Sequence, residues 1–304
     1  MKNNGPSLYS IALIIVMLLS CKHGTHENNP VNITDSIQDS NNNMTNNTAY
    51  KSDYASVNGI RMYYEIHGSG KPLVLIHGGG STIATAFGKI LPLLACKHRV
   101  IAVELQAHGR TSDRDAPESF DQDADDVAAL LHHLKINKAD ILGFSNGGQT
   151  AMKIAIRHPS IVNKLIAASA FYKRNGVPEQ FWQGMANATF ADMPQAYKDG
   201  FLALNNNQDA LLNMFNRDVQ RMRTFTDWND EELRSITAPT LLIAADKDVM
   251  LPEHTVAMHR LIPNSQLAIV PGGHGSYLGE ITTLVNGEWN ETYVTSLLEN
   301  FLSE

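Results

Sequence analysis

A serine in the middle of the chain has the neighbours that a nucleophile requires. Residues 143–147 read Gly-Phe-Ser-Asn-Gly; they close the apolar run 141–144 and precede the helical pattern 149–158. A sharp turn between a strand and a helix holds a serine hydroxyl above the edge of a sheet, and glycines on both sides leave room for the strained backbone to pack. The pattern therefore predicts that Ser145 is a catalytic nucleophile.

A glycine-rich segment earlier in the chain offers hydrogen-bond donors. Residues 75–80 read Leu-Ile-His-Gly-Gly-Gly and continue an apolar run. Together with the serine motif, this segment resembles the α/β-hydrolase superfamily, and the resemblance extends from Tyr54 to the carboxyl terminus. It implies an oxyanion hole formed by the backbone amides of Gly79 and Asn146. Glycine suits such a loop because no side chain blocks the approach of an N–H group.

Two aspartates after the apolar run 241–245 are candidates for the acid of a catalytic triad. In the superfamily that this chain resembles, the acid is typically followed four residues later by proline, and Asp248 stands four residues before Pro252. The resemblance therefore favours Asp248. In the alternative, Asp246 orients the histidine and Asp248 caps a helix.

The base is predicted from the order of residues along the chain. α/β-Hydrolases carry serine, acid and histidine in that order. Residues 271–275 read Pro-Gly-Gly-His-Gly after the apolar run 267–270, and of the twelve histidines only His274 follows both other candidates on a strand-end loop. We expect His274 to act as general base and then as general acid. His108 precedes the serine and does not fit this order.

These residues together predict the chemistry. A serine nucleophile disfavours haloalkane dehalogenation and epoxide hydrolysis and favours hydrolysis of carboxylic esters or lactones through an acyl-enzyme. The resemblance includes carboxylesterases, lactonases and macrolide esterases, so a macrolide-type lactone is one candidate substrate. The alternatives are a carbon–carbon bond hydrolase or a perhydrolase with the same triad, and a noncatalytic lipoprotein that binds a ligand. No metal or other cofactor is expected, because the mechanism needs none.

The elements that must position these residues follow from an alternating pattern. Short apolar runs suit the buried strands of a parallel sheet, at residues 73–77, 100–104, 141–144, 165–170, 240–245 and 267–270. Helical patterns lie between them, such as 121–134. Asn58 and Gly59 predict a two-residue hairpin before the first run. The expected fold is α/β, an α/β-hydrolase fold with a mostly parallel, doubly wound sheet built from residues 53–170 and 231–304.

Residues 171–230 interrupt this alternation with mostly helical sequence, for example 208–225. The insertion is longer than a crossover needs, so it predicts a helical cap over the carboxyl edge of the sheet. Apolar side chains of the segment could line a pocket or form the cap's own core. They are Phe181, Trp182, Met185, Phe201, Met214, Phe215 and Trp228.

The amino terminus has the pattern of an export signal. A lysine precedes the apolar run 11–19, and residues 18–21 read Leu-Leu-Ser-Cys, which resembles the lipobox of bacterial lipoproteins. This resemblance implies a signal peptide over residues 1–20 and acylation of Cys21, which would anchor an exported protein to a membrane of the bacterial cell envelope. An ordinary signal peptide is the alternative. Residues 21–52, rich in Asn, Thr and Ser, are expected to form a flexible tether.

The composition favours a single large folded domain and excludes some partners. The 304 residues are 43% hydrophobic and 18% charged. Without residues 1–20, which contain one lysine and no acid, the chain has 23 basic and 31 acidic residues, a net charge of −8. This sign disfavours nucleic acid as a partner. The expected partners are a small-molecule ester or lactone and, through the lipid anchor, a membrane.

Overall fold

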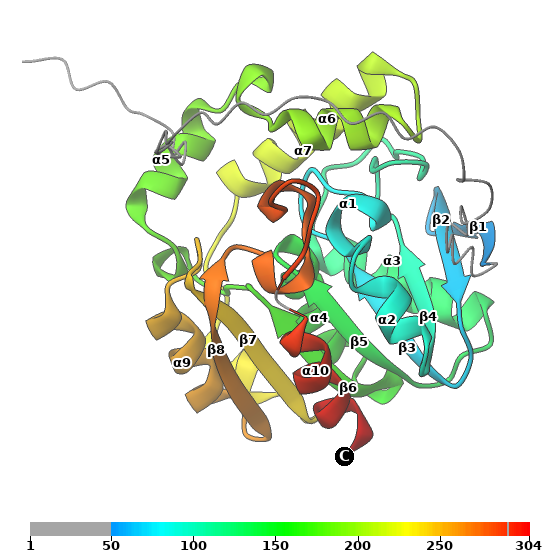
Figure 1. Ribbon diagram of the computed structural model, residues 1–304. Coiled ribbons are helices and arrows are strands. Elements are labelled where there is room, and N and C mark those ends of the chain that lie inside the picture. Colours follow the sequence, from blue (N-terminus) through cyan, green and yellow to red (C-terminus); the bar gives the residue numbers. More distant parts are fainter. Residues whose placement is uncertain (1–49, 291) are drawn as a thin grey trace, which may run out of the picture. The chain divides into compact units, whose positions relative to one another are not determined.

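An eight-stranded sheet in the order β1-β2-β4-β3-β5-β6-β7-β8 forms the centre of the folded part that the structure describes (Figure 1). The computed structural model describes residues 50–290 and 292–304. The strands from β4 to β8 pair in parallel, whereas β1 pairs antiparallel with β2, and β2 with β4. The predicted mostly parallel α/β sheet is confirmed. The strands are β1 (Lys51–Val57), β2 (Ile60–His67), β3 (Lys71–Ile76), β4 (His98–Val103), β5 (Ala139–Phe144), β6 (Val162–Ala168), β7 (Thr240–Lys247) and β8 (Ser265–Gly273).

Helices cover both faces of the sheet, because successive side chains of a strand point to opposite faces. In β3, Val74 and Ile76 pack with residues of α3 and α4, whereas Leu73 and Leu75 pack with residues of α1, α2 and α10. All four side chains are fully buried. The helices are α1 (Ile83–Phe87), α2 (Leu91–Ala95), α3 (Phe120–His133), α4 (Asn146–Arg157), α5 (Glu179–Asn187), α6 (Gln195–Leu202), α7 (Gln208–Arg223), α8 (Asp230–Arg234), α9 (Pro252–Leu261) and α10 (Tyr293–Ser303).

The segment between β6 and β7 is helical, and Figure 1 shows α5, α6 and α7 grouped above the sheet. Four of its side chains form a small core apart from those of the sheet: Met193, Phe201, Leu211 and Met214. We refer to α5–α7 and their connections as the cap. Because the cap has a core of its own, its inner surface can present further apolar side chains to the sheet edge.

The first strand begins slightly earlier than the sequence indicates. β1 starts at Lys51, two residues before the expected start of the core, because Lys51 and Ser52 pair with Ile66 and Glu65 of β2. The predicted signal peptide, Cys21 and nearly all of the predicted tether lie outside the described residues. Within the described part of the chain, no helix is both long and apolar enough to cross a membrane.

Candidate active site

Ser145 lies in a strained turn between β5 and α4. Its backbone has φ 55° and ψ −125°, in the positive-φ region that residues with side chains rarely adopt. Two glycines make this turn possible. A Cβ on Gly143 would lie 1.9 Å from the carbonyl oxygen of Gly147, and a Cβ on Gly147 would lie 2.1 Å from that of Ile76. The Ser145 N–H donates to the Ala168 carbonyl at 2.9 Å and so ties the turn to β6.

A chain of hydrogen bonds connects three side chains from segments at the carboxyl ends of β5, β7 and β8. His274 Nε2 lies 3.2 Å from Ser145 Oγ, and His274 Nδ1 lies 2.6 Å from Asp248 Oδ1. The Phe144 ring packs against the imidazole with 4.8 Å between ring centroids. The structure therefore brings together the three residues that the sequence indicated as nucleophile, acid and base, although the serine and histidine are 129 positions apart.

Asp248 is held as a buried carboxylate by several donors. Its side chain has no exposed surface, and its oxygens accept bonds from Ser169 Oγ at 2.5 Å and from the N–H groups of Ala245 and Met250 at 3.2 Å. Burial raises the pKa of Asp248, but the charge and hydrogen bond of His274, with the other donors, outweigh burial and lower this pKa below its ordinary value. The carboxylate is thus ionised at neutral pH.

Asp246, the alternative acid, has a different position. Its side chain is exposed, and its Oδ1 accepts a hydrogen bond from the Gly272 N–H at 2.8 Å. This bond supports the loop that carries His274. The imidazole itself faces Asp248.

Ser169 and Tyr277 form a polar support behind Asp248 that sequence reasoning missed. Ser169 follows β6 with φ 49°, is fully buried, and has its Oγ 2.7 Å from the Tyr277 hydroxyl in addition to its bond to Asp248. Because Ser169 ends an apolar strand, it is a polar residue at the same sheet edge as the other site residues. The position of Ser169 at the end of an apolar strand was the feature of the sequence that could have indicated its role beside Asp248.

The loop after β3 approaches Ser145 closely. A Cβ on Gly78 would lie 3.0 Å from Ser145 Cβ, and a Cβ on Gly79 would lie 2.6 Å from Asn146 Nδ2, so these positions favour glycine. Across residues 50–290 and 292–304, neither the Gly79 nor the Asn146 backbone N–H donates to another residue. Both residues line the same pocket as Ser145. Their amides can therefore donate to an oxygen bound beside the serine.

His77 fixes this loop from within the core. Its Nε2 accepts from the Leu105 N–H at 3.1 Å, and its Nδ1 donates to the Gly78 carbonyl at 2.8 Å. Burial, together with the positive charge of His108, lowers the pKa of His77 to about 3. The ring is therefore neutral at pH 7 and acts as one fixed donor and one fixed acceptor.

The pocket beside Ser145 has a volume of 240 Å³, and residues of the cap form much of its lining. Of the apolar cap residues named from the sequence, Phe181, Met185 and Phe215 line it. The other four, Trp182, Phe201, Met214 and Trp228, are buried in packing contacts. Some large side chains of the cap thus line the pocket, and others form packing contacts.

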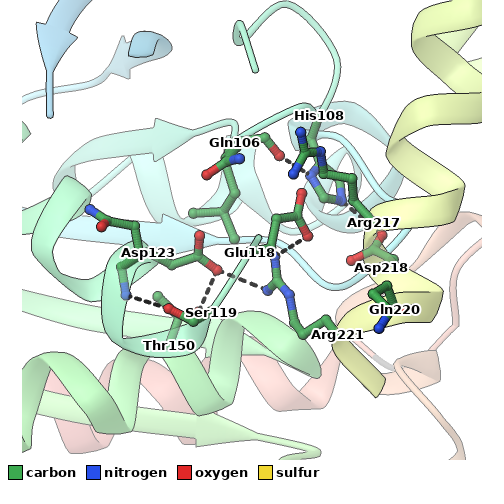
Figure 2. A network of polar contacts seen from close by, with 12 residues as sticks. Gln106, His108, Glu118, Ser119, Asp123, Thr150, Arg217, Asp218, Gln220 and Arg221 are labelled. Carbon is green, nitrogen blue, oxygen red and sulfur yellow. Dashed lines mark hydrogen bonds and ion pairs between the residues drawn. The ribbon is translucent and has the colours of Figure 1, made fainter. Parts of the chain in front are cut away.

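Asp218 of α7 connects the cap to the core, in the network of Figure 2. Its Oδ2 accepts from the Gly80 N–H at 2.6 Å and from His108 Nε2 at 3.0 Å, while His108 Nδ1 donates to the Gln106 carbonyl at 2.8 Å. Burial lowers the pKa of His108, but the charge of Asp218 and its hydrogen bond outweigh burial and raise this pKa to about 9. His108 is therefore protonated at neutral pH, and it is bound to the cap and not to Ser145.

The sheet, the serine turn and the capped pocket define an α/β hydrolase. Residues 73–280 match the alpha/beta hydrolase family, and the chain belongs to this family. It is 28% identical over 238 residues to the serine hydrolase BPHL of Homo sapiens, covering 74% of this chain and 80% of that protein. Among solved structures it is similar to a meta-cleavage product hydrolase from Pseudomonas fluorescens (21% identity, TM-score 0.67, 83% of this chain and 97% of that chain). It is also similar to an enol-lactonase from Burkholderia xenovorans (18% identity, TM-score 0.65, 83% and 100%).

Proposed function

We propose that this protein hydrolyses carboxylic esters or lactones through a Ser-His-Asp triad. The observation that carries the proposal is the chain of hydrogen bonds from Asp248 through His274 to Ser145, which ends in a pocket beside two backbone amides. This arrangement favours acyl transfer, because a nucleophile, a base and oxyanion donors surround the position of one reacting carbonyl.

The proposed reaction has two halves. His274 removes the proton of Ser145 Oγ as that oxygen attacks the carbonyl carbon, and the amides of Gly79 and Asn146 stabilise the resulting oxyanion. Asp248 holds the imidazole in one tautomer and stabilises the imidazolium. The intermediate expels the alkoxide, which takes the proton from His274, and an acyl-enzyme remains. Water then attacks the acyl-enzyme with His274 again as base, which releases the acid and restores the serine.

Pocket volume bears on the size of the substrate. At 240 Å³ the pocket is smaller than the roughly 300–1,000 Å³ of typical small-molecule sites. A small ester or lactone is therefore the substrate that we propose. A macrolide-type lactone would exceed this volume.

Labelling with a fluorophosphonate probe tests the proposal. We expect one equivalent of probe to attach to Ser145, as located by peptide mass spectrometry, because His274 activates this hydroxyl for attack on phosphorus as on carbon. A panel of esters and lactones followed by mass spectrometry would then define the substrate. Folded protein that neither reacts with the probe nor cleaves the panel would instead support the noncatalytic, ligand-binding alternative.

A carbon–carbon bond hydrolase is the second candidate, supported by the similarity to the meta-cleavage product hydrolase. The same triad can serve that reaction on this fold. Product analysis separates the two candidates: cleavage of a meta-cleavage diketone, without cleavage of any ester or lactone, would replace the leading proposal. A perhydrolase would show itself by forming peracid from hydrogen peroxide.

We also propose that the protein is exported and anchored by lipid at Cys21, on the strength of the lipobox-like sequence. In bacteria fed an alkyne fatty acid, the full-length protein should carry the label. Cys21→Ser should abolish labelling, whereas Cys96→Ser, which removes the exposed cysteine of the folded domain, should retain it. Label that persists in Cys21→Ser would contradict the anchor.

A further inference from the structure

One carboxylate oxygen in the pocket wall has no partner. Asp218 uses its Oδ2 for both of its hydrogen bonds, to Gly80 and His108. Its Oδ1 is buried and accepts no hydrogen bond from the part of the chain that the structure describes. This oxygen lies 3.3 Å from the point that a Cβ on Gly79 would occupy, so it stands beside a proposed oxyanion donor. A ligand N–H group at this oxygen would recover the free energy that burying it unpaired costs.

Asp218 carries a full negative charge in this wall. Its side chain is only 13% exposed. Burial raises the pKa of Asp218, but the charge and hydrogen bond of His108, with contributions from Arg221 and the Gly80 N–H, lower this pKa well below its ordinary value. The carboxylate is therefore ionised across the physiological range of pH.

Two cations near Asp218, His108 and Arg221, are already paired with acids, as Figure 2 shows. His108 is bound to Asp218, while Arg221 binds both Glu118 and Asp123. When all are ionised, three carboxylates thus face two cations. Burial raises the pKa of Glu118 to about 7 and also raises the pKa of Asp123, although Arg221 opposes both shifts. Because His108 and Arg221 are each bound to carboxylates, neither cation is free to bind a substrate anion.

The remaining pocket lining suits a cation as well. Among the described residues that line the pocket, none is Lys, Arg or His, and Asp192 is a second acid. Phe181, Tyr197 and Phe215 contribute one aromatic ring from each cap helix. Aromatic faces attract cations such as ammonium groups.

We propose that the pocket selects esters or lactones that carry an ammonium group, which donates to Asp218 Oδ1 and packs among the aromatic rings of the cap. This inference rests on the proposed hydrolase function and names its substrate class. The Gly80 N–H binds Asp218, and the neighbouring Gly79 N–H is a proposed oxyanion donor. An ammonium group bound to Asp218 therefore lies within a few bonds of the reacting carbonyl. A carboxylate at the same place in the substrate would be repelled.

Two pairs of esters with matched shapes test this selectivity at about pH 7 and low salt. In the first pair the charge is on the acyl side: methyl 4-(dimethylamino)butanoate, which is protonated, against methyl 5-methylhexanoate. In the second pair it is on the alcohol side: 2-(dimethylamino)ethyl acetate against 3-methylbutyl acetate. Mass spectrometry gives kcat/KM for each ester with the full-length protein.

In at least one pair we expect kcat/KM to be about tenfold higher for the cationic ester, equivalent to about 1.4 kcal/mol. Asp218→Asn, which keeps the shape but removes the charge, should bring that ratio close to one. Asp209→Asn removes a charge from the first turn of the same helix and should leave the ratio unchanged. If Asp218→Asn only disturbed the structure, it would lower kcat/KM for both esters of a pair by the same factor.

Equal values of kcat/KM within both pairs would overturn this inference while leaving the hydrolase intact. A cationic preference that survives in Asp218→Asn would overturn it as well. The ratios of kcat/KM measured with the wild-type protein test the inference even if Asp218→Asn does not fold. Failure to cleave any ester would contradict the hydrolase and this inference together.

Discussion

Ser145→Ala is expected to lower kcat/KM for p-nitrophenyl esters by about a million-fold, the size of loss seen when a triad nucleophile is removed. The variant keeps the Gly79 and Asn146 amides but has no oxygen that can form the acyl-enzyme. Thermal unfolding followed by circular dichroism should stay close to wild type, because only the hydrogen bond to His274 is removed.

Ser169→Ala is the matched control for that experiment. It removes a second serine hydroxyl from a positive-φ position at the end of a neighbouring strand. Since Ser169 touches Asp248 and not the substrate, its loss should reduce activity far less. Full activity in Ser145→Ala, or equal losses in the two variants, would show that the nucleophile was wrongly assigned.

Asp248→Asn should lower kcat by about ten-thousand-fold, as expected when an amide replaces the acid and the histidine is held in the wrong tautomer. KM should change little, because Asp248 is buried behind His274 and does not line the pocket. Steady-state kinetics at saturating ester measures this effect.

Asp246→Asn provides the comparison for that loss. Its side-chain oxygen can still accept the Gly272 N–H, so a change of less than about tenfold is expected, of the size of one exposed hydrogen bond. If Asp246→Asn cost more activity than Asp248→Asn, the acid would be Asp246.

Much of the site could be predicted because parallel strands end at one edge of a sheet. The apolar runs before Ser145, Asp248 and His274 indicated strands β5, β7 and β8, and strand direction then places their following residues close together. The short glycine-flanked turn at Ser145 depends only on neighbouring residues. These features rest on local sequence and sheet geometry, so no knowledge of distant contacts was needed.

Other parts of the site depend on how distant segments pack, and the sequence pattern does not contain that information. His108 was set aside because of its place in the chain, and only the docking of α7 shows that Asp218, 110 positions later, binds it. Among the cap aromatics, Phe181 faces the pocket while its neighbour Trp182 is buried. Helical periodicity could not assign these two directions before the orientation of α5 was known.

The attachment of α7 to the loop after β3 couples the cap to the residues beside Ser145. Any movement of α7 away from the sheet would break the hydrogen bonds of Asp218 to both the Gly80 N–H and the His108 imidazolium. The position of this helix and the position of the loop that carries Gly79 are therefore linked through one carboxylate. A substitution at Asp218 would loosen the helix and the loop together.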